Sequence, residues 1–270
     1  MAPIPPPALP SAPLNARIKA DLVGAKPTWQ AASHIVVRNN FNAQSHPERD
    51  PLASVRDVSV QVSHPAGTFS CTIYTPEVSL AGPLPVLVYF HGGGFVIGNP
   101  ASHKAQAVWC ATGASCIVVS VDYRLAPEFP YPTPVHDSVE AVEWVFNNAK
   151  ELNINPKRIT VGGDSAGGNL TTVVALELGG RKDSKTIICQ QLLVYPVTDL
   201  LRLYPDSYDS YIRYGTGLGL ETKSMIWLID HYLDGLGEKL TPAEFQSRAA
   251  EMTASPIVAT SEELSLGHRS

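Results

Sequence analysis

The stretch Val161-Gly162-Gly163-Asp164-Ser165-Ala166-Gly167-Gly168 contains a G-x-S-x-G motif that runs from Gly163 to Gly167. An apolar run precedes the motif and a helical pattern follows it. A serine in this context lies on a strained turn between a strand and a helix, which lifts its hydroxyl out of the sheet. Glycines two residues on either side let such a turn close without side-chain clashes. The motif therefore predicts that Ser165 is a nucleophile at the end of a strand.

Other segments around this motif alternate between two patterns. Four short apolar runs, bounded by Gly, Pro or polar turns, are typical of strands buried on both faces. They are residues 86–90, 117–121, 159–161 and 192–195. Apolar residues spaced by three and four positions over 135–146 and 170–178 predict helices between these strands. The alternation predicts an α/β fold, with a mostly parallel sheet flanked by helices. Upstream, residues 58–62 and 69–74 predict a hairpin.

Composition restricts the class of protein further. The 270 residues, 44% of them hydrophobic, suffice for one α/β domain. A net charge of −5 gives no electrostatic case for a nucleic-acid partner. Neither a signal peptide nor a membrane span is predicted, so we expect a cytoplasmic protein; the oligomeric state stays open. The four cysteines form no C-x-x-C pair, which predicts free thiols and no metal site.

A glycine-rich loop, His91-Gly92-Gly93-Gly94-Phe95, directly follows the first of the four predicted strands. Its backbone N–H groups are unobstructed by side chains and can donate to the oxyanion that forms when a carbonyl is attacked. We predict that the N–H groups of Gly93, Gly94 and Ala166 form an oxyanion hole. A glycine-rich turn without a catalytic role is the alternative, and the serine motif downstream favours the oxyanion hole.

We predict structural rather than catalytic roles for the charged residues and histidines near these motifs. Asp164 adjoins the serine, so its side chain should point away from that hydroxyl and brace a loop rather than serve as a triad acid. Residues 122–128, with the sequence DYRLAPE, predict an ion-pair and turn network that braces the glycine loop. His91 is expected to be structural, and His103 and His136 are expected in helical or turn regions.

Four motifs in order, and a fifth segment, resemble the hormone-sensitive-lipase-like branch of the α/β-hydrolases over roughly residues 15 to 265. They are HGGGF at 91–95, DYRLAPE at 122–128, GDSAGGN at 163–169, YPVTD at 195–199 and SPIVA at 255–259. The resemblance implies hydrolysis of small to medium acyl esters without a metal or organic cofactor. It also implies that Ser165, Gly93, Gly94 and Ala166 are the catalytic parts.

The resemblance further implies a division of the chain into a core and a helical cap. The expected parts are a disordered proline-rich tail at 1–14, cap segments at 15–52 and 201–253, the α/β-hydrolase core at 53–200 and a return to the core at 254–270. Candidates for lining an acyl pocket are Trp29, Phe95, Tyr204 and Trp227.

The sequence departs from the family pattern after the SPIVA segment. The family continues there with two strands that carry the triad Asp and His, and neither motif is present. His231 is expected to pack within the cap, and His268 lacks a strand to hold it. We therefore expect a C-terminally shortened, weakly active esterase, with the last strands of the core missing and strand 192–195 near an unpaired edge. A non-catalytic small-molecule-binding protein and a tailoring hydrolase or acyl-transfer enzyme of secondary metabolism are the alternatives.

Overall fold

A computed structural model describes most of the chain. The described residues are 33–43, 52–78, 82–181, 188–201, 211, 214–217, 220–237 and 239–266. The expected tail at 1–14 lies outside this part of the chain, and so do Trp29, Tyr204 and His268.

The elements alternate along the chain as the sequence predicts. The strands are β1 (Leu52–Ser63), β2 (Ala66–Pro76), β3 (Leu84–Phe90), β4 (Ile117–Asp122), β5 (Ile154–Asp164) and β6 (Ile188–Val194). The helices are α2 (His34–Asn42), α3 (Lys104–Ala114), α4 (Thr133–Asn147), α5 (Ala166–Gly180), α7 (Thr222–Asp234), α8 (Pro242–Ala249), the short 3₁₀ helix η2 (Pro256–Val258) and α9 (Ser261–Leu266).

A six-stranded mixed sheet in the order β1-β2-β4-β3-β5-β6 forms the centre of the molecule. Strands β4, β3, β5 and β6 run parallel, which confirms the four strands expected from the short apolar runs. The predicted hairpin is β1 and β2, which pair antiparallel around a turn at His64 and Pro65. Strand β2 also pairs antiparallel with β4, so the parallel part of the sheet begins at β4.

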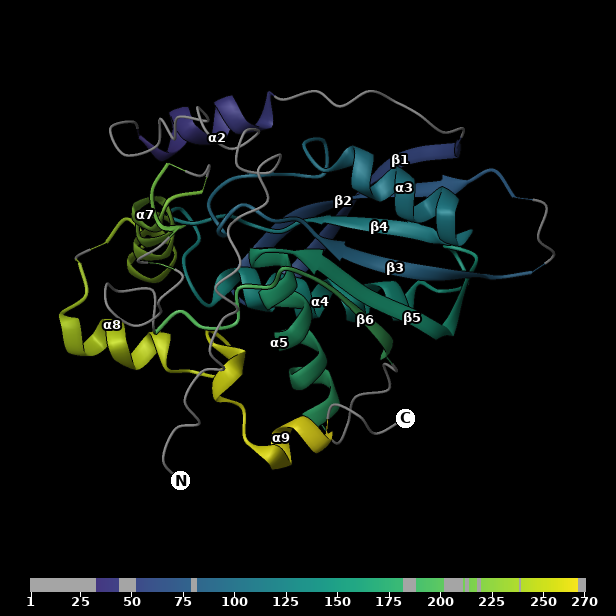
Figure 1. Ribbon diagram of the computed structural model, residues 1–270. Coiled ribbons are helices and arrows are strands. Elements are labelled where there is room, and N and C mark those ends of the chain that lie inside the picture. The colour runs from purple at the N-terminus through teal and green to yellow at the C-terminus, as the bar shows by residue number, and fades with distance from the viewer. Residues whose placement is uncertain are drawn as a thin grey trace.

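Helices cover both faces of the sheet, with α3 on one face and α4 and α5 on the other (Figure 1). Alternate residues of β3 serve the two layers because successive side chains of a strand point to opposite faces. Val88 and Phe90 belong to the larger core with α4 and α5, whereas Leu87 and Tyr89 pack with α3. This two-sided burial explains why the strands read as continuous apolar runs.

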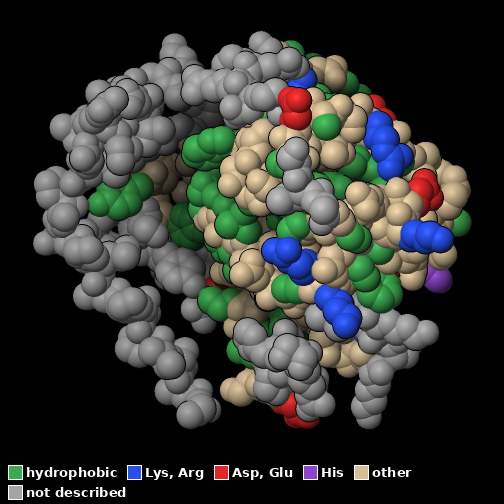
Figure 2. Space-filling model, turned by 90° about the vertical axis from the view of Figure 1, so that its right-hand side faces the viewer, with side chains coloured by type: hydrophobic (Ala, Val, Ile, Leu, Met, Phe, Trp, Pro, Cys, Tyr) green, Lys and Arg blue, Asp and Glu red, His purple; other side chains and the backbone are tan. Residues whose placement is uncertain are grey.

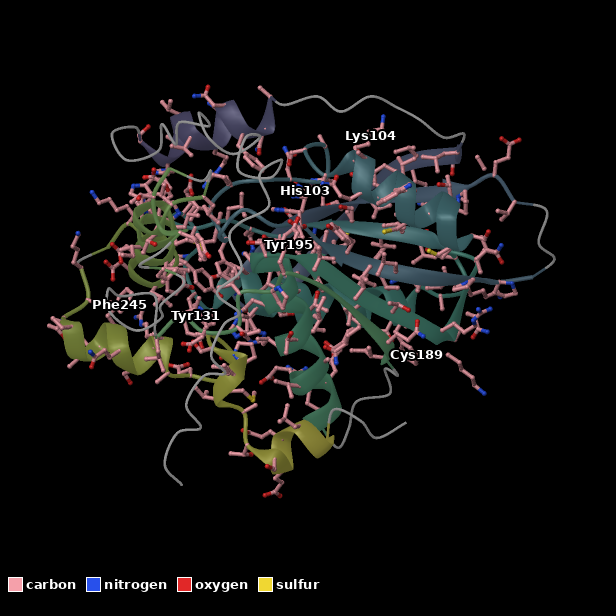
Figure 3. The ribbon with its side chains drawn as sticks, in the orientation of Figure 1. His103, Lys104, Tyr131, Cys189, Tyr195 and Phe245 are labelled. Atoms are coloured by element: carbon pink, nitrogen blue, oxygen red, sulfur yellow. The ribbon has the colours of Figure 1, made fainter. Side chains whose placement is uncertain are left out.

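Strand β6 lies at the edge of the sheet and, among the described residues, pairs only with β5. Leu192 and Leu193 are 41% and 42% exposed, and Tyr195, just beyond the strand, is 73% exposed. Cys189 lies at the other end of this strand (Figure 3). The structure thus agrees with the expectation of an apolar edge, and it leaves all four cysteines as free thiols.

The helices α2, α7 and α8 gather beyond the carboxyl ends of the parallel strands (Figure 1). This arrangement agrees with a cap, whose boundaries at 15–52 and 201–253 stay predictions. The return segment joins the core where Leu200 N donates to Ser255 Oγ at 2.8 Å.

Three observations concern the composition of the helices and of the surface. No helix in the described part of the chain is both long and apolar enough to cross a bilayer. On the face shown in Figure 2, Lys and Arg side chains are dispersed among hydrophobic and other groups rather than gathered in a stripe. The His, Cys, Asp and Glu side chains that the structure describes form no cluster of three or more that could hold a metal ion.

Candidate active site

Ser165 occupies the sharp bend between β5, which ends at Asp164, and α5, which begins at Ala166. Its backbone has φ 53° and ψ −116°, a conformation that a residue with a side chain rarely adopts and that costs about 1–3 kcal/mol. Neighbouring backbone holds the bend in place: Ser165 N donates to Val194 O at 2.9 Å, and Ser165 O accepts from Val197 N at 3.1 Å. The end of β6 therefore stabilises the strained residue.

The two motif glycines permit a close approach between this bend and the end of β3. A Cβ atom at Gly163 or at Gly167 would overlap the carbonyl oxygen of Phe90. The glycines therefore let the turn close, as the sequence predicts, because a side chain at either position would collide with the backbone of Phe90.

The glycine loop that follows β3 folds back on itself at two glycines with positive φ, Gly93 at 123° and Gly94 at 58°. The N–H groups of Val96 and Ile97 both donate to Gly93 O, at 3.1 and 3.0 Å, and close the loop. Within the described residues, the N–H groups of Gly93, Gly94 and Ala166 donate to no other protein group. Such unpaired donors are what an oxyanion site requires.

The serine and the glycine loop line the same cavity, which has a volume of about 260 Å³. Its remaining lining residues come from six segments and are mostly apolar. They are Phe41 of α2, Phe95 and Ile97 of the glycine loop, His103 and Asp164, Tyr195 and Val197 after β6, and Leu220, Met225, Leu228 and Ile229 of or beside α7. Helices α2 and α7 thus supply one wall of the cavity.

Of the four residues expected to line this cavity, two lie in the described part of the chain. Phe95 is confirmed. Trp227 is not among the lining residues, because its ring packs against His231 at a centroid distance of 4.1 Å. Trp227 faces this neighbour on α7, one helical turn away, rather than the pocket.

Two other histidines near the cavity, His91 and His231, act as packing groups. His91 is fully buried and stacked on Tyr123 at 4.3 Å, and its Nδ1 contacts Gly92 O at 2.8 Å. Burial, with the nearby His103, lowers the pKa of His91 to about 3, so the ring is neutral and structural, as predicted. His231 Nδ1 contacts Trp227 O at 2.8 Å, within its own helix. No described histidine hydrogen-bonds to the Ser165 hydroxyl.

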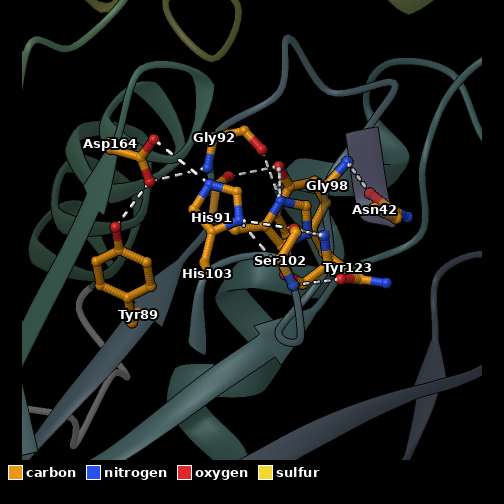
Figure 4. Close-up of polar contacts among 10 residues, drawn as sticks. Asn42, Tyr89, His91, Gly92, Gly98, Ser102, His103, Tyr123 and Asp164 are labelled. Carbon is orange, nitrogen blue, oxygen red and sulfur yellow. Dashed lines mark hydrogen bonds and ion pairs between the residues drawn. The ribbon is translucent and has the colours of Figure 1, made fainter. Parts of the chain in front are cut away.

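His103 is the functional candidate that sequence reasoning missed. It lies in the turn that begins α3, as the sequence predicts, but it also lines the wall of the cavity. Its Nε2 is 3.6 Å from Asp164 Oδ2 and its Nδ1 is 3.0 Å from Ser102 Oγ (Figure 4). Figure 3 shows it, like Tyr195, toward the carboxyl ends of the strands. No local signal marks His103, because its partner Asp164 lies far along the chain.

The segment after β4 braces the glycine loop, as its charge density predicts. Ala126 N donates to Phe95 O at 2.9 Å, and the Tyr123 hydroxyl donates to His91 O at 2.8 Å. Arg124 forms a buried ion pair with Asp137 of α4, with Nη2 to Oδ1 at 2.6 Å. The brace is therefore anchored in the core.

Arg38, which carried no signal in the sequence, ties α2 to the same network. It donates from Nε to Val96 O at 2.7 Å and from Nη2 to Ala126 O at 2.8 Å, and it pairs with Glu128. Asn42 Oδ1 adds a contact by accepting from Gly98 N at 3.0 Å. These bonds hold Phe41 of α2 in the cavity wall.

Comparison with known proteins identifies the family. The family model described as alpha/beta hydrolase fold matches residues 87–266. The chain belongs to this family, in the hormone-sensitive-lipase-like branch that its motifs resemble.

Individual relatives are esterases. Carboxylesterase NlhH of Mycobacterium tuberculosis is 49% identical over 129 residues, which are 47% of this chain and 39% of that protein. The structure of EstE1, a thermophilic carboxylesterase cloned from a metagenomic library, matches at a TM-score of 0.73 and 35% identity, covering 85% of this chain and 74% of that one. A fungal esterase of Rhizomucor miehei matches at a TM-score of 0.80 and 29% identity, covering 94% and 76%.

The matched part of this chain spans 39% of the length of NlhH and 46% to 59% of the length of two other curated relatives. Neither the structure nor the comparisons test the expectation of a C-terminally shortened chain, which stays a prediction.

Proposed function

We propose that this chain is a carboxylic-ester hydrolase of small to medium acyl esters in which Ser165 is the nucleophile. One observation carries the proposal: the strained serine and the free amides of the glycine loop line a single cavity with apolar walls. The esterase relatives support the same reaction class.

In the proposed reaction, Ser165 Oγ attacks the acyl carbon of the ester and loses its proton to a base. The carbonyl oxygen becomes an oxyanion that accepts hydrogen bonds from the N–H groups of Gly93, Gly94 and Ala166. Collapse of this intermediate expels the alcohol and leaves an acyl-enzyme, which water hydrolyses. The apolar side chains from α2 and α7 would surround the acyl group.

The base determines how fast this reaction runs. Since no described imidazole contacts the serine, the oxyanion donors and binding alone would supply on the order of 10³–10⁴-fold acceleration over water. We therefore expect slow turnover from the chain, with the oxyanion site intact. A small-molecule ester is the proposed substrate; a cytoplasmic location and the lack of a nucleic-acid partner stay predictions from composition.

The test is hydrolysis of p-nitrophenyl acetate and butyrate, combined with mass spectrometry of the acylated protein. We expect p-nitrophenol release above the buffer rate and an acetyl group on the peptide that contains Ser165. Ser165→Ala should abolish both, whereas Ser54→Ala on β1, an exposed serine, should change neither. Equal release by the wild-type protein and Ser165→Ala would show that the serine is not the nucleophile.

A second function, non-catalytic binding of a small apolar molecule, is favoured by the lack of a contact between Ser165 and any described histidine. A protein of this kind would gain thermal stability from an ester or alcohol without consuming it, because a ligand that binds only the folded state raises Tm. A raised Tm with no product over a day would favour this function over hydrolysis.

A further inference from the structure

One buried carboxylate, that of Asp164, connects the strand that precedes the serine with the glycine loop. Asp164 ends β5, directly before Ser165, and its side chain lies against the glycine loop (Figure 4). Its Oδ1 accepts hydrogen bonds from Gly92 N at 3.0 Å and from the Tyr89 hydroxyl at 2.7 Å. Its Oδ2 lies 3.6 Å from His103 Nε2. The nucleophile strand, the glycine loop and the start of α3 thus meet on a single side chain.

The contact with the loop is close enough to require glycine at position 92. A Cβ atom there would lie 3.0 Å from both Cγ and the carbonyl oxygen of Asp164, and closer still to Oδ2. The amide held by Asp164 is one peptide unit before the amide of Gly93. The bond between Asp164 and the Gly92 amide therefore limits where the N–H group of Gly93 can lie relative to Ser165.

The carboxylate is held in its charged form. Burial raises the pKa of Asp164, but the His103 ring, the Tyr89 hydroxyl and the Gly92 amide together lower it below its ordinary value. A charged acceptor binds an N–H group about twice as strongly as a neutral one. His103, itself buried, lies beside the charge and is fixed by Ser102, so the carboxylate has few orientations available.

We propose that Asp164 is a positioning residue for the reaction at Ser165: supported by Tyr89 and His103, its carboxylate sets the distance between the serine and the oxyanion donors of Gly93 and Gly94. This inference rests on the proposed function for its chemistry, but not for its geometry. Asp164 acts through the glycine loop and does not itself touch the substrate.

The test measures the rate at which a p-nitrophenyl alkylphosphonate modifies Ser165, followed by intact mass. We expect Asp164→Ala to slow this modification by about tenfold or more, because misplaced oxyanion donors reduce the stabilisation of the transition state. Asp164→Asn should recover most of the rate, since its Oδ1 still accepts from Gly92 and Tyr89. Modification of Asp164→Ala at the wild-type rate would overturn the proposal.

A matched control separates positioning from a general loss of stability. Asp122 is a half-buried carboxylate at the end of another strand, β4; it accepts from Ser70 Oγ at 3.2 Å and is not part of the cavity wall. Asp122→Ala should lower Tm without slowing the modification of Ser165. Equal slowing in the Asp122 and Asp164 variants would mean that the effect is only structural.

Hydrogen exchange of the peptide that covers residues 91–98 gives a readout that does not depend on reactivity. Exchange should rise in Asp164→Ala and stay near the wild-type level in Asp164→Asn. If the phosphonate does not modify Ser165 in the wild-type protein, the proposed function fails. Hydrogen exchange then remains as the test of whether Asp164 positions the glycine loop. Unchanged exchange, or a rise equal over the whole chain, would overturn it. Should Asp164→Ala not fold, Tyr89→Phe, which removes one bond to the carboxylate, should raise the same exchange to a smaller extent.

Discussion

Replacing Asp137 with alanine should destabilise the folded protein by about 3–5 kcal/mol, the usual effect of removing one partner of a buried ion pair. Asp137 of α4 is fully buried, and the side chain of its partner Arg124 is 8% exposed. The substitution would leave the guanidinium group of Arg124, which is largely shielded from solvent, without its ion-pair partner.

The size of this effect follows from the bonds that are lost. The carboxylate accepts from Arg124 N at 2.9 Å, from Nε at 2.9 Å and from Nη2 at 2.6 Å. Each buried donor left without an acceptor costs about 1–3 kcal/mol, and partial relaxation toward solvent keeps the sum near the stated range. For a domain of this size, where 1 kcal/mol shifts Tm by about 2–4 °C, the expected loss is about 6–20 °C.

The assay is urea unfolding followed by circular dichroism, with calorimetry for Tm. Glu143→Ala is the matched control, because Glu143 is a carboxylate of the same helix whose partner, Arg181, is exposed. Surface pairs contribute about 0–1 kcal/mol, so this variant should unfold almost as the wild type does. If Asp137→Ala and Glu143→Ala lose the same stability, the buried-charge reasoning is wrong.

Replacing both members of the pair extends the same test. Arg124→Met combined with Asp137→Leu should recover much of the lost stability, since the desolvation of two charges offsets most of their attraction. Recovery would show that the pair is retained for placing the segment that holds Phe95 rather than for stability. A double variant as unstable as Asp137→Ala would instead indicate that the lost stability comes from the hydrogen bond between Arg124 N and the Asp137 carboxylate.

Three further predictions concern the cap and the loop. Arg38→Ala should raise hydrogen exchange throughout α2, because the side chain bonds Glu128 and two carbonyls of the pocket wall; unchanged exchange would contradict this. Leu228→Ala should cost about 2–5 kcal/mol in urea unfolding and shift ester preference toward longer acyl chains, since Leu228 fills the space beside Gly94; an unchanged preference would refute the assignment of this wall. The pKa of His91 is about 3 in the folded protein and about 6.5 unfolded, so the unfolded state binds more protons between these values. Stability should therefore fall as pH falls from 6.5 toward 3, by up to about 1.4 kcal/mol per unit, and His91→Gln should flatten a plot of Tm against pH.

Features set by local sequence were predictable. The bend at Ser165 follows from two glycines that must pass Phe90 O, and the loop at 91–95 follows from three consecutive glycines after a strand. The four parallel strands and helices α4 and α5 follow from period and length, because burial on both faces of the sheet leaves a continuous apolar run in each strand. These signals lie within a few residues of the structure they determine.

Features set by distant pairing were not predictable. In the sequence, His103 has only the signal of a turn residue and Arg38 that of an ordinary helix residue. The fold places His103 beside Asp164 and brings Arg38 into hydrogen-bond contact with Val96, 58 positions away. Asn169 is similar: its Nδ2 donates to Val197 O and to Ala254 O, each at 2.8 Å, which ties the helix after the serine to the return segment. A single sequence holds no information on which distant acceptor such a side chain will find.

Helix α7 contacts the glycine loop itself and not only the cavity beside it. The rings of Phe95 and Tyr232 stack at 3.8 Å with an interplanar angle of 10°, and Leu228 fills the space beside Gly94. Tyr232 O also accepts from Tyr131 N at 2.8 Å, which fixes the helix to the core. Because the same helix shapes the acyl space and presses on the residues that carry the oxyanion donors, a substitution that enlarges the pocket should also displace those donors. Acyl preference and the rate of serine acylation should therefore change together among α7 variants, whereas substitutions at Phe41, which lines the cavity from another helix, α2, should change the preference alone.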